Sequence, residues 1–186
     1  MKNKDLDIII IKGAPSSGKS TTAKELAKYF SGGVRMEIDN LRSMVISVEW
    51  TNQIEHIEIL NVSTQLIKNL YDLNYKPIIV IDTFSGNKII DYLERLNNIK
   101  KDWEISIFGL YVTESEIKKR LDLRTDKFKD FEISKEINND MIKFKLKNEI
   151  QIDTTELTAK ETSKLIYDYL ENRTPGGNRV DGPASN

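Results

Sequence analysis

Short runs of apolar residues alternate along this chain with longer stretches in which apolar positions recur every three or four residues. The short runs predict buried strands, and the recurring positions predict helices that pack one face against a sheet. Strands are predicted at 6–12, 34–38, 77–82, 104–112 and 149–153. Helices are predicted at 18–30, 40–48, 53–73, 86–97 and 134–148, and after the capping boxes Thr113/Glu116 and Thr158/Glu161, the last one running to about 172.

This alternation of strands and helices predicts an α/β fold, with a five-stranded, mostly parallel sheet and helices on both faces. We expect one domain over residues 1–172, with a short helical lid at about 114–133. Residues 173–186 change abruptly to glycine, proline and small polar side chains. Such a segment cannot bury apolar surface, so we expect a flexible tail there.

Composition narrows the environment in which the protein works. Its 186 residues carry 28 basic and 29 acidic side chains, a balance that gives no general attraction to nucleic acid. The absence of cysteine excludes disulfides and thiolate metal sites. The N-terminal apolar run is too short for a signal peptide or a membrane span, so we expect a cytoplasmic protein without a membrane partner. Composition leaves the oligomeric state open.

A complete phosphate-binding motif, G-x-x-x-x-G-K-[ST], lies between the first predicted strand and the first predicted helix. It comprises Gly13, Ala14, Pro15, Ser16, Ser17, Gly18, Lys19 and Ser20, and Thr21 follows it. In this setting backbone N–H groups converge on nucleotide phosphates, helped by the positive end of the helix dipole. Lys19 is expected to reach the β- and γ-phosphates, and Ser20 to bind Mg²⁺. The motif therefore predicts a site for ATP with Mg²⁺.

Three other stretches separate the classes of protein that share this loop. Residues 82–86 are one residue too long for the D-x-x-G of a GTPase switch, and 98–102 are misspaced for the N-K-x-D that reads guanine. Thr83 stands where motor ATPases usually place a water-activating glutamate. These departures favour a kinase, in which a substrate hydroxyl attacks instead of water.

Two carboxylates end predicted strands, at the sheet edge where parallel α/β proteins bind their ligands. Asp39 follows the second strand and is a candidate for the carboxylate beside an acceptor hydroxyl; its alternative role is a helix N-cap. Arg42 stands three residues on, as a candidate substrate contact. Asp82 ends the third strand and is a candidate metal or substrate residue, with a buried capping role as the alternative.

Arg120 and Arg124 lie four residues apart, on one face of the helix predicted after the fourth strand. Their planar, forked donors suit phosphate oxygens, so we expect both to act in catalysis from a lid. Lys127 and Lys129 follow among interleaved aspartates, which favours a solvated surface for these lysines.

Three further residues have two interpretations each. The only histidine, His56, lies in the charged start of a predicted helix, which favours an exposed structural role over that of a catalytic base. Trp50 and Phe84 fall in loops near the expected acceptor side. Each could stack on a planar substrate or pack in the core.

These residues resemble those of the small P-loop kinases, over about residues 5–172. Within that superfamily the chain is most similar to chloramphenicol phosphotransferases, polynucleotide 5′-kinases and zeta-toxin-type kinases. The matching pieces are 13–20, 38–42, 78–83, the Arg120/Arg124 pair and 152–155. The resemblance implies a nucleoside-monophosphate-kinase-like fold in which Asp39 is the general base. It also implies that Arg120 and Arg124 close on the phosphates, and that the segment at Thr155 flanks the adenine.

The leading hypothesis is an ATP-dependent phosphotransferase that moves the γ-phosphoryl group to a hydroxyl of a small molecule, such as an antibiotic, nucleoside or sugar. The near-neutral charge favours that acceptor, whereas the basic residues of 118–129 and the pair Asp39/Arg42 favour a polynucleotide 5′-hydroxyl. A non-catalytic nucleotide-binding switch is the second alternative. It would need neither a base nor a lid.

Overall fold

Five parallel strands form one sheet in the order β2-β3-β1-β4-β5 in the computed structural model, which describes residues 6–125 and 128–172. The strands are β1 (Ile8–Gly13), β2 (Val34–Glu37), β3 (Ile78–Asp82), β4 (Ile105–Tyr111) and β5 (Glu149–Asp153). All four described pairings are parallel, which confirms the predicted α/β sheet. The expected tail at 173–186, and Lys127, lie outside the described residues.

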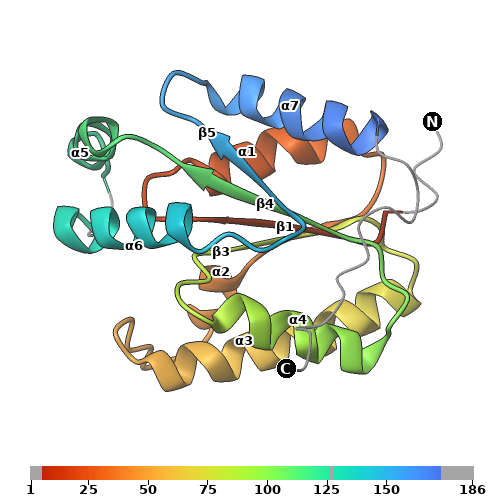
Figure 1. Cartoon of the computed structure of the whole chain (residues 1–186). Coiled ribbons are helices and arrows are strands. Elements are labelled where there is room, and N and C mark those ends of the chain that lie inside the picture. Colours follow the sequence, from red (N-terminus) through yellow and green to blue (C-terminus); the bar gives the residue numbers. More distant parts are fainter. Residues whose placement is uncertain (1–5, 126–127, 173–186) are drawn as a thin grey trace.

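Helices cover both faces of the sheet (Figure 1). One face carries α1 (Lys19–Leu26), continued by a 3₁₀ turn (Ala27–Tyr29), and α7 (Ala159–Asn172). The other face carries α2 (Ile38–Arg42), α3 (Gln53–Asp72) and α4 (Lys88–Ile99). The remaining helices, α5 (Glu114–Asp122) and α6 (Phe131–Lys143), lie at the end of the sheet toward which the strands point.

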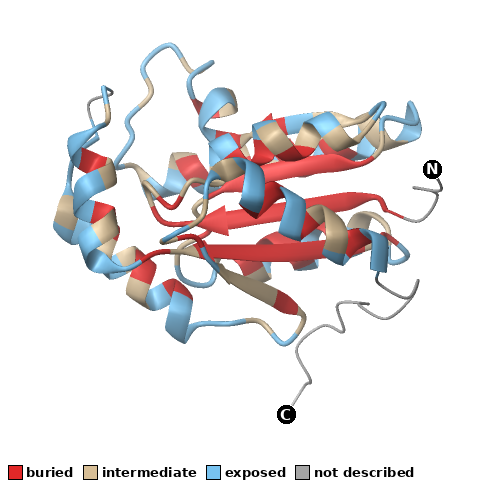
Figure 2. Ribbon diagram, turned by 90° about the horizontal axis from the view of Figure 1, so that it is seen from above, coloured by how far each residue is buried: buried red, intermediate tan, exposed pale blue. Residues whose placement is uncertain are grey.

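The core lies in two layers because successive strand residues point to opposite faces of the sheet. In β1, Ile8 and Ile10 join the cluster under α3 and α4, whereas Ile9 and Ile11 join the cluster under α1 and α7. The strands are therefore almost continuously buried, while the helices bury one side only (Figure 2). Because helices cover both faces, the carboxyl edge of the sheet is where a ligand would bind.

The helix expected at 40–48 is wrong in its length, because α2 ends at Arg42. After that residue the chain turns with short-range hydrogen bonds, from Met44 N to the Leu41 carbonyl (3.1 Å) and from Val45 N to the Arg42 carbonyl (3.0 Å). The Arg42 guanidinium binds the carbonyls of Glu49 (3.1 Å) and Trp50 (3.3 Å). These contacts need the chain to fold back, which a continued helix would prevent.

The two predicted capping boxes behave differently. In the second, Thr158 N donates to Glu161 Oε2 (2.9 Å) and Glu161 N donates to Thr158 Oγ1 (3.2 Å), which confirms the box. In the first, the Thr113 N–H donates to Thr155 Oγ1 (3.0 Å) instead, and Arg120 Nε binds Glu116 Oε1 (2.8 Å). Thr113 is still the N-cap of α5, but the predicted box is wrong because distant Thr155 takes the Thr113 N–H and Arg120, one turn along the same helix, takes the Glu116 carboxylate.

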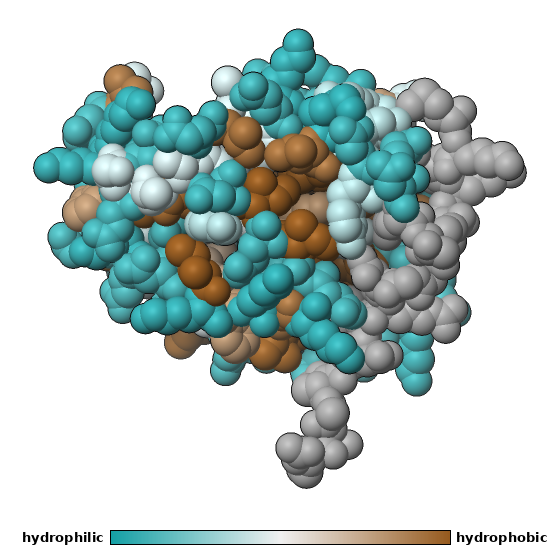
Figure 3. All heavy atoms as spheres, turned by 45° about the horizontal axis from the view of Figure 1, so that its top comes forward, coloured by the Kyte–Doolittle hydropathy of each residue, from teal (hydrophilic) through white to brown (hydrophobic). Residues whose placement is uncertain are grey.

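The face of the molecule in Figure 3 is mostly hydrophilic, and apolar side chains come through in its middle part. Among the described helices, none has both the length and the apolar character that crossing a membrane requires.

Candidate active site

The loop between β1 and α1 has the backbone shape of a phosphate cradle. Gly18 has φ +89°, a left-handed conformation that glycine adopts at no steric cost, and Ser16 also has a positive φ of +68°. A Cβ atom on Gly13 would stand 2.2 Å from Ser17 Oγ and 2.9 Å from the Leu110 carbonyl. Consequently only glycine fits at position 13, and the loop closes tightly over the end of β1.

This loop presents unsatisfied donors. No side chain caps the N-terminus of α1, so the first N–H groups of the helix have no partner within it. Within the described part of the chain, the buried Ser17 hydroxyl also lacks a hydrogen-bond partner. Lys19 Nζ lies 3.4 Å from the Ala14 carbonyl, folded over the loop, and Ser20 is exposed at the start of α1. An anionic ligand would satisfy the first N–H groups of α1 and pair with the Lys19 ammonium, so the loop fits nucleotide phosphates.

Lys19 is electrostatically coupled to three of the other predicted site residues. Burial lowers the pKa of the Lys19 ammonium, the carboxylates of Asp39 and Asp82 oppose that shift, and the charge of Arg124 adds to it. Such coupling requires short separations. The strand pairings agree, because β2 pairs with β3 and β3 with β1, so Asp39, Asp82 and the phosphate loop follow strand ends at one edge of the sheet, and Arg124 Nη1 lies 3.5 Å from Ser16 Oγ of the loop.

Asp39 and Arg42 lie on the same short helix, α2, but in different environments. Asp39 is exposed in the first turn. Arg42 is buried, and its guanidinium contacts the 49–55 segment, including Glu55 Oε1 at 3.4 Å and the Trp50 ring at 4.9 Å. Arg42 thus orders the chain between α2 and α3, while Asp39 is open to a ligand.

Asp82 is buried at the end of β3, and both its oxygens accept hydrogen bonds. His56 Nε2 lies 3.1 Å from Oδ1, and the Phe84 N–H lies 2.9 Å from Oδ2. Burial opposes ionisation, but the hydrogen bond from His56, the Phe84 N–H and the charge of Lys19 hold the pKa of Asp82 below its usual range. The carboxylate is thereby kept ionised and oriented.

The expected exposed position of His56 is wrong, since 6% of the residue is accessible. The charged neighbours of His56 in the sequence favoured exposure. In the structure α3 packs against β3, and this packing brings the imidazole to Asp82. Phe84 lies in the core, 2% exposed, with its ring 5.0 Å from that of Tyr92. Trp50, which lines the turn around Arg42, is half-exposed.

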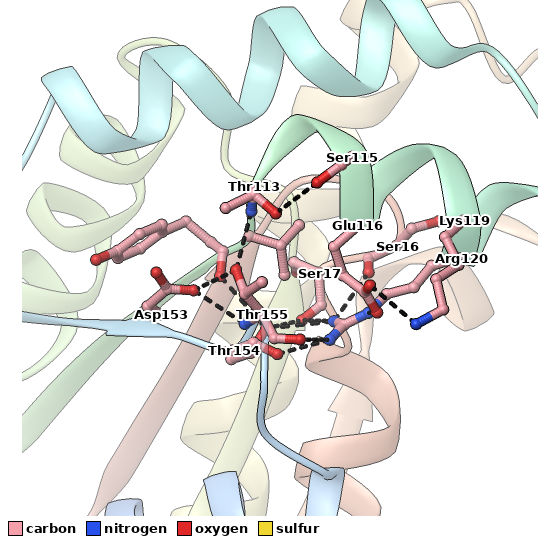
Figure 4. A network of polar contacts seen from close by, with 12 residues as sticks. Ser16, Ser17, Thr113, Ser115, Glu116, Lys119, Arg120, Asp153, Thr154 and Thr155 are labelled. Atoms are coloured by element: carbon pink, nitrogen blue, oxygen red, sulfur yellow. Dashed lines mark hydrogen bonds and ion pairs between the residues drawn. The ribbon is translucent and has the colours of Figure 1, made fainter.

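Arg120 ties three segments together (Figure 4). Its Nη2 donates to the carbonyl of Thr154 (2.6 Å), and its Nη1 lies 3.5 Å from the carbonyls of Ser16 and Ser17. Glu116, one turn earlier on α5, accepts from its Nε and orients the guanidinium. Arg120 therefore braces the phosphate loop against the β5–α7 connection, a role that its sequence position alone did not indicate.

Arg124 reaches the same loop more loosely, with Nη1 3.5 Å from Ser16 Oγ and the guanidinium 6.0 Å from the Phe128 ring centre. Thr155 accepts from the Thr113 N–H and donates its hydroxyl to Asp153 (2.6 Å). The structure thus brings the predicted arginines and the Thr155 segment to one side of the loop.

A cavity of about 310 Å³ opens beside the phosphate loop, between the 84–86 turn and α6. It is lined by four apolar residues and five polar or small ones: Phe84, Ile137, Met141 and Phe144, and Lys12, Ser85, Gly86, Asp140 and Lys143. Lys12 directly precedes the loop and forms a buried ion pair with Glu149 of β5, 2.8 Å apart. Sequence reasoning missed this pair; a lysine inside an apolar strand was the available signal.

Magnesium fits this edge only in company with a nucleotide. Among the described residues, no group of three or more histidine or acidic side chains is arranged to hold a metal ion. Mg²⁺ is usually bound by one or two carboxylates together with substrate phosphates and water. The Ser20 hydroxyl and the Asp82 carboxylate are the predicted protein groups, and the phosphates would complete the set.

The strand order and the loop are those of the P-loop kinases, and solved structures with that fold match the chain. The tunicamycin resistance protein of Deinococcus radiodurans is 16% identical, with a TM-score of 0.65 over 89% of this chain and 95% of that one. The APS kinase CysC of Mycobacterium tuberculosis, solved with AMPPNP and APS, is also 16% identical, with a TM-score of 0.65 over 90% and 99%. The chain therefore has the P-loop kinase fold.

A chain of the Pnkp1/Rnl/Hen1 RNA repair complex is 22% identical, with a TM-score of 0.60 over 78% of this chain and 49% of that one. Residues 6–76 match the family model of Chromatin associated protein KTI12. That stretch contains the phosphate loop, Asp39 and His56. No curated protein matches the chain significantly.

Proposed function

We propose that this protein is an ATP-dependent kinase that phosphorylates a hydroxyl group of a small, uncharged molecule. The observation that carries the proposal is the arrangement at the sheet edge, where Asp39 and Asp82 stand at the ends of the strands next to the phosphate loop and Arg124 Nη1 lies 3.5 Å from Ser16 Oγ of that loop. A phosphoryl transfer site needs cations for the phosphates and a carboxylate for the acceptor, held in one place. The candidates are Lys19 and Arg124 for the cations and Asp39 for the carboxylate.

In the proposed reaction, the acceptor oxygen bonds to the γ-phosphorus of ATP while the bond from that phosphorus to the bridging oxygen breaks. ADP leaves, and the hydroxyl proton passes to the Asp39 carboxylate. Lys19 and Arg124 counter the charge on the transferring group, and magnesium, when bound, supplies further charge neutralisation. Arg120 keeps the loop in shape through its contacts with the Ser16 and Thr154 backbones.

The cavity beside the loop supports a small acceptor. Its volume of about 310 Å³ is at the lower end of the range for small-molecule sites. Apolar side chains form almost half of its lining, and the charges of Asp140 and Lys143 offset each other at its polar part. Such a lining suits an uncharged molecule with an apolar body, and gives little to a polyanion.

Two other functions have particular support. The similarity to a chain of the RNA repair complex, and the basic residues Lys118, Lys119 and Lys129, favour a polynucleotide 5′-hydroxyl acceptor. The KTI12 model bears the name of a chromatin associated protein, so a non-catalytic nucleotide-binding module is the other candidate. Neither accounts for the apolar lining of the cavity.

The test is a screen for ATP consumption and product formation over sugars, nucleosides, antibiotics and 5′-hydroxyl oligonucleotides, at saturating Mg²⁺. The Lys19→Ala protein serves as a matched control for contaminating kinases. We expect transfer to at least one uncharged alcohol by the wild-type protein only. Transfer to 5′-hydroxyl oligonucleotides alone would show that the acceptor is a polynucleotide and not a small molecule. If the protein binds ATP but transfers phosphate to none of the compounds, the non-catalytic module is favoured.

A further inference from the structure

His56 joins three elements at the carboxyl edge of the sheet. It lies in the first turn of α3, and its ring is buried between the end of β3 and the start of α4. Nε2 stands 3.1 Å from Asp82 Oδ1, and Nδ1 stands 3.2 Å from Lys88 Nζ. The imidazole therefore uses both nitrogens, each toward a different charged partner.

The two partners fix which nitrogen carries the proton. A lysine ammonium can only donate, so Nδ1 accepts from Lys88, and Nε2–H then donates to Asp82. Lys88 is itself held, with Nζ 2.6 Å from Gln53 Oε1 and 3.4 Å from Ser85 Oγ. A chain of directed hydrogen bonds thus runs from α4 through α3 to the carboxylate on β3.

This chain of bonds leaves Asp82 little freedom. Donors from two separate segments, His56 and the Phe84 backbone, bind its two oxygens, so the plane of the carboxylate is set before any ligand arrives. In the sheet Asp82 pairs with Lys12, the residue that directly precedes the phosphate loop. The oriented carboxylate consequently lies at the strand end next to the phosphate loop.

We propose that His56, held by Lys88, is a positioning residue that orients Asp82 for the magnesium ion accompanying the nucleotide. The inference rests on the proposed nucleotide site and adds a residue to it. Groups that orient a ligating side chain are commonly worth about 10- to 100-fold in metal affinity. A core histidine that only fills space would give no such dependence.

Two substitutions separate orientation from packing. Glutamine places its amide nitrogen where Nε2 stands, so His56→Gln keeps a donor toward Asp82. Asparagine places its amide where Nδ1 stands, so His56→Asn keeps a partner for Lys88 and loses the bond to Asp82. Both variants remove the ring, and a purely structural role would affect them alike. Lys88→Met, at a half-buried position, removes the fixed proton arrangement while keeping the ring.

The measurement is ATP affinity by calorimetry, with and without Mg²⁺, in the absence of any acceptor. The quantity compared is the factor by which Mg²⁺ increases ATP affinity. We expect this factor to be about tenfold smaller in His56→Asn than in the wild-type protein, and nearly unchanged in His56→Gln. Lys88→Met should fall between them. ATP affinity without Mg²⁺ should stay unchanged in all three variants. Asp82→Asn is the reference, because it removes the carboxylate itself and shows the largest loss of the Mg²⁺ effect that can be expected.

Equal behaviour of His56→Asn and His56→Gln, or no loss in either, would overturn the inference. So would a wild-type protein that binds ATP equally with and without Mg²⁺. Unfolding curves identify any variant that fails to fold. If a His56 variant does not fold, Lys88→Met is the test, and an unchanged Mg²⁺ effect on ATP affinity in that variant would overturn the inference. Because no acceptor is present, the result is independent of whether the transfer assay finds a substrate.

Discussion

Two parts of the sheet edge differ in how completely their polar groups are satisfied. The phosphate loop, residues 13–20, has an uncapped helix start, a buried Ser17 hydroxyl without a partner in the described residues, and a lysine folded over it. The β3 end, comprising His56, Asp82 and Lys88, has a partner for both imidazole nitrogens and both carboxylate oxygens. The first is built to receive an anion, and the second is already organised.

The difference has an energetic consequence. At the phosphate loop the ligand supplies the missing partners, so its removal or the loss of a donor should have large effects on binding and rate. At the β3 end the protein supplies the partners, so a single substitution there should give a graded change in orientation. The predictions below test this difference, from the largest expected effect to the smallest.

The largest effect is expected at the phosphate loop. Lys19→Ala should lower turnover by at least about 10³-fold, because its ammonium would counter the charge that develops on the β- and γ-oxygens during transfer. Transfer of labelled phosphate in single-turnover assays measures it, with circular dichroism as the control for folding. Near wild-type turnover in a folded variant would contradict the view that the phosphate loop depends on its ligand-binding groups more strongly than the β3 end does.

The next largest effect is expected from the exposed carboxylate on α2. Asp39→Asn keeps the shape of the side chain and loses the proton acceptor, so turnover should fall by roughly 10²-fold. ATP affinity should change little, since Asp39 acts on the acceptor in the proposed mechanism. A collapse of ATP affinity with preserved turnover of bound substrate would instead assign Asp39 to the metal or to the fold.

Arg120 and Arg124 should separate the support of the loop from its chemistry. Arg120→Ala removes contacts with Ser16, Ser17 and Thr154, so we expect a loss of about 2 kcal/mol in the free energy of unfolding as well as a lower rate.

Arg124→Ala should lower the rate with a smaller loss of stability, because Arg120 joins the loop to the β5–α7 connection through a hydrogen bond of 2.6 Å to Thr154, whereas Arg124 Nη1 lies 3.5 Å from Ser16 Oγ. Denaturant unfolding and steady-state kinetics on both variants give the comparison, with Lys129→Ala as a surface control. Equal stability losses in the two arginine variants would contradict it.

The smallest effect is expected from salt on the acceptor. An uncharged acceptor in the cavity between the 84–86 turn and α6 releases no condensed counterions, so its KM should stay nearly flat as salt rises. A single-stranded polynucleotide should instead show a log–log slope of about −0.7 for each phosphate contact. The assay needs saturating ATP and constant Mg²⁺. A steep slope would favour the polynucleotide acceptor.

The sequence by itself determined those features that depend on contiguous residues. The phosphate loop was readable because one short segment carries its glycines, its lysine and its flanking strand and helix. The strands were readable because burial on both faces requires unbroken apolar runs such as Ile8–Ile11. The box at Thr158 and Glu161 was readable because both its hydrogen bonds are local.

Tertiary structure alone decided the features in which distant groups compete for one partner. Thr113 and Glu116 have the same spacing as Thr158 and Glu161, but the Thr113 N–H donates to Thr155, 42 residues away. His56 has a polar, helical neighbourhood in sequence, and its burial follows from the packing of α3 against Asp82, 26 residues away. A local sequence pattern shows which hydrogen-bonding groups are present in a segment. Which of them pair depends on distances that only the folded chain sets.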